Sequence, residues 1–128
     1  MSENSVITYI RREKLCKVTS GAIPTIPPIT HVAFGTGGNK PDGDPIPPKV
    51  TQTTLTAEVA RYPIESVEYP LSTTARYTVR IPESNLPGVT INEAALVDAE
   101  GDIAAIKTMY SKRKDVDVEF VFSFDDEY

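Results

Sequence analysis

The chain contains one cysteine, one histidine and no tryptophan among its 128 residues. Because one thiol cannot form an intramolecular disulfide or a thiolate zinc cluster, both kinds of cross-link are excluded. This cysteine content is typical of a protein that folds in a reducing compartment. We expect Cys16 to be a buried or half-buried structural thiol, and His31 to be a structural or surface residue, because neither belongs to a catalytic set.

The sequence also lacks long apolar runs and an excess of positive charge. No stretch approaches the roughly 18 apolar residues of a membrane span, and residues 1–10 lack the apolar segment of a secretory signal. The formal net charge of −5 argues against a nucleic-acid backbone as the main partner. We therefore expect synthesis in the cytosol, with no membrane partner and no nucleic-acid partner.

The composition that is present is that of a globular, β-rich protein. A chain of 14.0 kDa is large enough to bury a core, and its 11 prolines indicate long ordered loops. We predict a mainly β fold of the α+β class, an antiparallel β-sheet or sandwich with an N-terminal amphipathic helix. The predicted organisation is a helical segment over residues 1–21 and a single β domain over 22–128, with a Pro/Gly-rich loop at 35–50.

Helical spacing of apolar side chains appears over residues 5–18, with basic residues between them. Gly21 follows as a plausible C-terminal stop. We expect the basic face to be solvated, with docking of an acidic partner as the less favoured reading. The candidate interaction residues, which would pack on the sheet or on a neighbouring subunit, are Ile7, Ile10, Arg11 and Leu15.

Alternating and continuous apolar segments predict the strands of the β domain. Residues 51–61 fit either one helical turn or a strand, and we favour the helical turn. Gly101 supplies the positive φ of a hairpin, and the acidic tail over residues 125–128 is expected to be solvated. The predicted strands are Ile29 to Phe34, Ile64 to Leu71, Thr74 to Ile81, Ile91 to Val97, Ile103 to Tyr110 and Val116 to Phe124.

Two motifs invite a ligand-binding interpretation and do not support it. Residues 35–40 form a glycine-rich run after a strand, but their spacing matches neither a phosphate-binding loop nor a dinucleotide fingerprint. Asp42 and Asp44 lie in a turn that offers too few oxygen ligands for a calcium loop. We expect no cofactor and no metal, and favour an ordered or semi-ordered loop over an ion site.

Glu93 is a carboxylate within an otherwise apolar strand. An ion pair with an arginine is the favoured reading, while a role in a site and a solvent-facing position are the alternatives. An acid/base pair with Asp98 or Glu100 can be drawn, but nothing in the sequence fixes the separation. No catalytic set emerges, so we predict that the protein is not an enzyme. The candidate arginine partners are Arg61, Arg76 and Arg80.

The order of these segments resembles the short tail-fibre or tail-collar attachment proteins of tailed phages and prophages. The resemblance spans nearly the whole chain and is moderately specific in its pairing of an apolar-apolar-Phe-Gly-x-Gly-Gly segment with Ile-x-Glu-x-x-Leu-x-Asp-x-x-Gly about 50 residues later. The segments that carry it are Arg11 to Gly21, Ile29 to Gly38, Leu55 to Arg61, Ile91 to Asp102 and the final alternating strand.

The resemblance implies a structural virion component that attaches tail fibres to the baseplate or tail tip. Its expected partners are tail, baseplate and fibre proteins, its expected assembly is a homo-oligomer such as a trimer, and its expected location is the virion tail after assembly in the bacterial cytoplasm. Because the chain stops at Tyr128, we expect an attachment module without the fibre. The residues expected to be structural are Phe34, Gly35, Glu93 and Gly101.

A second function remains open at this point. A carbohydrate-binding module used in host recognition would cluster aromatic side chains on one exposed loop face. The same tyrosines suit a strand core equally well. The candidates for such a cluster are Tyr62, Tyr69, Tyr77 and Tyr110.

Overall fold

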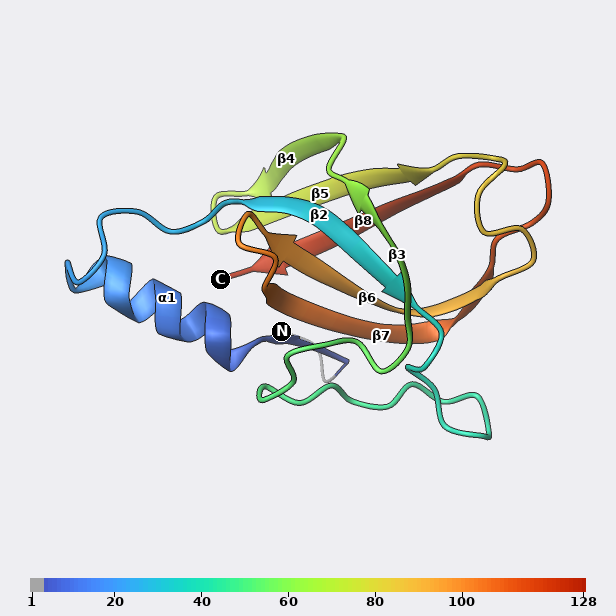
Figure 1. Cartoon of the computed structure of the whole chain (residues 1–128), viewed down its shortest axis with the longest axis horizontal. Coiled ribbons are helices and arrows are strands. Elements are labelled where there is room, and N and C mark those ends of the chain that lie inside the picture. Colours follow the sequence, from blue (N-terminus) through green and yellow to red (C-terminus); the bar gives the residue numbers. More distant parts are fainter. Residues whose placement is uncertain (1–3) are drawn as a thin grey trace.

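A computed structural model of the chain describes residues 4–128, so the first three residues of the predicted 1–21 segment lie outside it. The described residues form a β-sandwich with one short helix, which confirms the predicted fold class (Figure 1). The elements in chain order are β1 Ser5–Ile7, α1 Tyr9–Thr19, β2 Ile29–Gly35, β3 Glu58–Pro63, β4 Ser66–Leu71, β5 Thr74–Ile81, β6 Thr90–Asp98, β7 Ile103–Arg113 and β8 Phe120–Glu127.

The strands pair into two antiparallel sheets. The larger sheet has the order β1-β7-β6-β2-β3, and the smaller has the order β4-β5-β8. The hairpin of β6 and β7 is as predicted, and Gly101 in its turn has a φ of +86°, a conformation that L side chains rarely adopt. Apolar residues fill the space between the sheets, where Phe34 packs edge-on against Phe122 with ring centroids 5.3 Å apart.

The larger sheet is covered on its second face too. Alternate residues of β2 and β6 contribute to a second buried cluster, in which Ala33 and Ala95 pack with Leu55 from the long loop between β2 and β3. That loop runs beside β7 (Figure 1) and is held there by the Thr108 hydroxyl, which donates to the Ile46 carbonyl at 2.8 Å. Burial on both faces explains why β6 and the first part of β7 are largely apolar in sequence.

The predicted helix over residues 5–18 was wrong at its start. Residues 5–7 form strand β1, which pairs with β7 in the register Ser5↔Lys107. Thr8 then caps the helix, because its hydroxyl accepts the backbone N–H of Arg11 at 3.3 Å. A local apolar period cannot reveal that a distant strand offers backbone partners to these residues.

Two strand predictions also need correction. The favoured helical turn in residues 51–61 is wrong, since Glu58–Pro63 forms β3 and pairs with β2. The last strand begins at Phe120 instead of Val116, because Asp117 has a φ of +63° and interrupts the extended chain. It then continues to Glu127, so the acidic tail is part of the smaller sheet; Asp126 is buried, while Glu127 and Tyr128 are exposed as expected.

Candidate interaction surface

Helix α1 is fastened to the sandwich by polar groups. The Thr8 hydroxyl donates to the Ile103 carbonyl at 2.6 Å, at the start of β7. One turn on, Arg11 is 7% exposed and its Nη1 donates to the Pro27 carbonyl at 2.7 Å. The expectation of a solvated basic face is therefore wrong for Arg11, which is buried where the helix packs on the rest of the protein.

Lys14 completes this attachment at the turn between β6 and β7. Its Nζ donates to Asp98 Oδ2 at 2.6 Å and to Asp102 Oδ2 at 2.8 Å, and it lies 3.1 Å from Glu100 Oε1. Burial alone would lower the pKa of Lys14, but the hydrogen bonds to Asp102, Asp98 and Glu100 outweigh it, and the pKa is raised above its usual range. These carboxylates are close enough together to suit a metal ion, and the lysine ammonium binds all three.

Beside β1, an apolar part of the helix surface is open. A hollow of about 420 Å³ between the helix and β1 is lined by Ile7, Leu15 and Val50, among others. A second hollow lies beside Leu15 and Cys16, and Arg12 borders both. We call this region, formed by Ile7, Arg12, Leu15, Cys16 and Val50, the helix groove.

Of the predicted interaction residues, Ile7 and Leu15 line the helix groove, Ile10 is half-buried, and Arg11 lies beneath the helix. Cys16 is exposed, so its expected burial is wrong. The helix packs through Thr8, Arg11 and Lys14, which leaves the face with Cys16 in contact with solvent.

Glu93 has a structural role that the favoured arginine pairing did not anticipate. The residue is 1% exposed. Its carboxylate accepts hydrogen bonds from the backbone N–H groups of Gly37 at 2.9 Å, Thr56 at 2.9 Å and Ala57 at 2.8 Å. Asn92 Oδ1 accepts the N–H of Gly38 at 2.7 Å. These bonds hold both ends of the long loop against β6, so Glu93 and Asp98 are both engaged elsewhere and form no acid/base pair.

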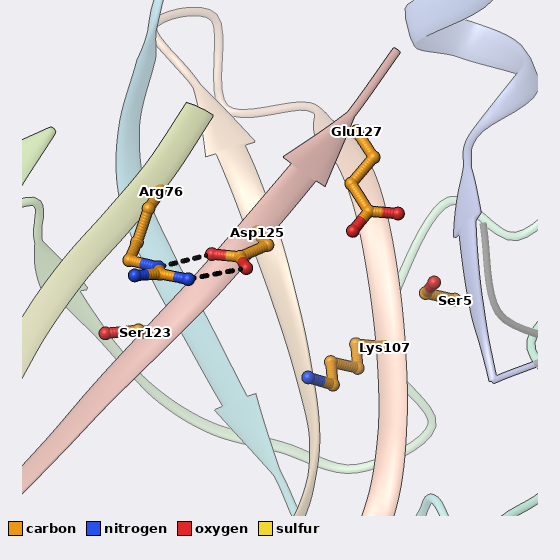
Figure 2. Close-up of a pocket in the computed structure, with 6 residues that line it drawn as sticks. All are labelled: Ser5, Arg76, Lys107, Ser123, Asp125 and Glu127. Atoms are coloured by element: carbon orange, nitrogen blue, oxygen red, sulfur yellow. Dashed lines mark hydrogen bonds and ion pairs between the residues drawn. The ribbon is translucent and has the colours of Figure 1, made fainter. Parts of the chain in front are cut away.

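A polar hollow of about 330 Å³ lies beside the edge of the smaller sheet (Figure 2). On β8, Asp125 accepts two hydrogen bonds from Arg76, at 2.8 and 3.1 Å. The guanidinium hydrogen bond lowers the pKa of Asp125. Across the hollow, Lys107 of β7 and Ser5 of β1 face Ser123 and Glu127.

Asp126 points the other way, into the molecule. It is 4% exposed and accepts a hydrogen bond from the Tyr128 hydroxyl at 2.8 Å. Burial raises the pKa of Asp126, although the hydrogen bond from Tyr128 and the charge of Arg11 act in the opposite direction. The last residues of the chain are therefore anchored near the first turn of α1, where Arg11 lies.

The tyrosines considered for carbohydrate binding do not share one exposed face. Tyr62 and Tyr77 are half-buried and pack against the core between the sheets. Tyr69 and Tyr110 are 74% and 67% exposed, but they lie on strands of different sheets. His31 is half-buried, with its Nδ1 2.9 Å from the Thr30 hydroxyl.

Sequence reasoning missed the attachment through Lys14. The signal was present in two parts, because Arg11 and Lys14 are three residues apart on one helix face and acids occupy positions 98, 100 and 102 of a predicted turn. Nothing in either segment says that the two meet.

Across residues 4–128, no helix combines the length and apolar character needed to cross a bilayer.

Comparison with known proteins agrees with the resemblance stated from the sequence. The family described as phage tail-collar fibre protein, N-terminal, matches residues 1–119. No curated protein and no solved structure matches the chain. The match spans α1 and the strands β1 to β7 and stops before β8, so it covers most of the chain, and the chain belongs to the family described as phage tail-collar fibre protein, N-terminal.

Proposed function

We propose that the protein is a non-enzymatic structural adaptor that attaches tail fibres to the baseplate or tail tip of a phage or prophage particle. The family match supports a tail component, and the attachment role is the part that we propose. The observation that carries this step is the orientation of α1. The helix is held to the sandwich by Arg11 and Lys14, and the apolar hollow between it and β1 remains available to another protein.

The helix groove suits docking for a physical reason. Apolar side chains such as Ile7, Leu15 and Val50 remain in contact with water in the isolated chain, and covering them is favourable at roughly 25 cal/mol per Å². A partner that presents an amphipathic segment would cover them. Around a tail axis, repeated copies would assemble with rotational symmetry, and we include a homotrimer in the proposal.

Incorporation into particles tests the adaptor role. The full chain, carrying an epitope tag, is expressed during growth of its phage, and purified tails are examined by immunogold electron microscopy. We expect label at the baseplate or tail tip only. Particles that lack the chain, or that carry it along the whole tail tube, would contradict the proposal.

A matched pair of variants tests the helix groove. We expect Leu15→Glu to lower incorporation by about tenfold, equivalent to about 1.4 kcal/mol of lost contact energy. Glu13→Gln, on the same helix but outside the groove as defined, should leave incorporation unchanged. Circular dichroism confirms that each variant is folded, and light scattering of the purified chain, expected at three times the 14.0 kDa chain mass, tests the trimer.

A further inference from the structure

We propose that the outer edge of β8, with which no strand within residues 4–128 pairs, accepts an extended segment of a partner protein as a fourth strand of the smaller sheet. The segment alternates acidic side chains, which face Lys107, with basic side chains, which lie beside Glu127. This surface is separate from the helix groove, and the inference does not depend on the adaptor role.

The backbone of β8 is prepared for such pairing. β8 ends the order β4-β5-β8 and pairs with β5 in one unbroken register over residues 120–127. The Tyr128 N–H donates to the Thr73 carbonyl at 2.9 Å, which fixes the alternation of the ladder. By that alternation, the peptide groups of Val121, Ser123, Asp125 and Glu127 point away from β5.

The edge carries acidic side chains, of which Asp126 points inward, but it lacks other usual protections of an outer strand. Sheet edges are commonly blunted by proline, lysine, bulges or very short strands. β8 contains neither proline nor lysine, and no register shift interrupts it. At the opposite edge, β4 carries Pro70 and an irregular register, so the two edges of this sheet differ in the way expected if one of them is used.

A hollow of about 330 Å³ lies along this edge. The smaller sheet stops at β8, whereas the larger sheet continues through β7 to β1. The polar hollow beside β8 has Lys107 and Ser5 on its far side (Figure 2). A strand added along β8 would lie over this flank of the larger sheet and make the two layers more nearly equal in width.

The charges in the hollow define the partner's chemistry. Arg76 and Asp125 hydrogen-bond to each other, and the charge of Lys107 also lowers the pKa of Asp125, while no close salt bridge within residues 4–128 involves Lys107 or Glu127. Side chains of an added strand alternate between faces, so one set would face Lys107 and the other would lie beside Glu127. A segment that alternates acidic and basic residues meets both groups.

A second copy of β8 does not meet this requirement. Its charged side chains between Phe120 and Glu127 are Asp125, Asp126 and Glu127, which are all acidic. It could bring a carboxylate to Lys107 but no base to Glu127. Like charges placed opposite one another on paired strands are destabilising. We therefore assign the edge to a segment of a different sequence.

The experiment uses the full chain and a capped synthetic peptide of about eight residues with alternating Glu and Lys at its centre, a length typical of a strand. Its control has the same composition with the Glu and Lys residues in blocks. We expect the alternating peptide to slow amide exchange about tenfold at Val121, Ser123, Asp125 and Glu127, and the block peptide to leave it unchanged.

Two variants complete the design. Ser123→Pro removes the outward N–H and should abolish binding, whereas Ser123→Ala keeps that N–H and should bind as the parent chain does. Lys107→Glu should weaken binding about tenfold and be rescued by a peptide with Lys at the inward positions. Protection at another edge, equal binding by both Ser123 variants, no effect of alternation, or protection by self-association without peptide would each overturn the proposal.

Discussion

Glu93 Oε2 accepts the backbone N–H of Gly37 at 2.9 Å, and this bond joins the start of the long loop to the centre of the larger sheet. The same oxygen accepts the N–H of Ala57, at the far end of the loop. A carboxylate buried without a basic partner is tolerated here because backbone N–H groups satisfy it. The residue therefore closes the loop, and it does so through contacts that no sequence pattern announces.

Gly35→Ala should destabilise the fold. A Cβ at this position would stand 2.7 Å from Glu93 Cγ and 2.8 Å from the Ala57 carbonyl oxygen, so the loop or the carboxylate must move. We expect a loss of about 2 kcal/mol in the free energy of unfolding, measured by urea denaturation. Gly21→Asn is the control, since nothing lies within 4 Å of Gly21 and asparagine tolerates its left-handed backbone. Equal stability of Gly35→Ala and the parent chain would show that the close packing is unimportant.

Glu93→Gln should loosen the long loop. The amide NH₂ cannot accept the N–H groups that one carboxylate oxygen now accepts, so at least one buried N–H loses its partner. We expect a loss of about 1–3 kcal/mol and faster hydrogen exchange at Gly37, Thr56 and Ala57. Exchange of Phe122 and Phe124, in the other sheet, should change only with global stability. Unchanged exchange at the three loop amides would refute the role assigned to Glu93.

Lys14→Met should release α1 while the sandwich stays folded. The substitution removes the ammonium group bound to Asp98 and Asp102 and leaves Arg11, 3.7 Å from Asp98, as the nearest cation. We expect a loss of about 2 kcal/mol, with faster exchange along the helix. Lys17→Met, which breaks only an exposed pair with Glu13, should cost less than about 0.5 kcal/mol. A helix equally protected in both variants would show that Lys14 does not hold it.

Asp126→Asn should stabilise the protein at pH 8 and have little effect at low pH. Burial raises the pKa of Asp126 in the folded chain, so the folded state holds its proton more tightly than the unfolded state. Stability therefore falls as pH rises from the ordinary carboxyl pKa to the raised one, and asparagine removes that loss. The midpoints of urea denaturation at pH 8 and at a pH below the ordinary carboxyl pKa measure this difference in stability.

Asp125→Asn, at the neighbouring residue, should change the stability at pH 8 in the opposite direction. Its hydrogen bond with Arg76 lowers the pKa of Asp125, so its contribution to stability is present above the unfolded pKa and is lost as pH falls through the lower value. The variant should be less stable than the parent chain at pH 8. If both substitutions changed the urea midpoint in the same direction at pH 8, the assigned burial of Asp126 would be wrong.

Much of the fold could be predicted from local pattern. Thr74–Ile81 was predicted at its observed bounds, because alternation of polar and apolar residues along it reflects one buried face. The β6–β7 hairpin was predicted because Gly101 marks the turn and the segments on either side of it are largely apolar. Errors occurred where pairing, not side-chain pattern, decided the structure, as in β1 and β3.

The candidate surface was less accessible to prediction. Ile7 and Leu15 were identified as contact residues on helical spacing, and both line the helix groove, yet Ile7 belongs to a strand. Arg11 was placed on a solvated face and is buried, because the helix packs on the sandwich with polar groups. Hydrophobic periodicity places Ile10, Leu15 and Val18 on the more buried side of α1, but it could not show that the helix is held through Arg11 and Lys14.

The sequence by itself determined the β-rich class, the central hairpin and the alternating phenylalanines of β8, since each depends on residues adjacent in the chain. Only the tertiary structure decided that Lys14 meets Asp98, that Glu93 closes a loop, and that β8 lies at an open edge. The reason is physical: a local pattern fixes which side of a strand or helix is apolar, but backbone pairing and charge pairing between distant segments depend on where the whole chain brings them.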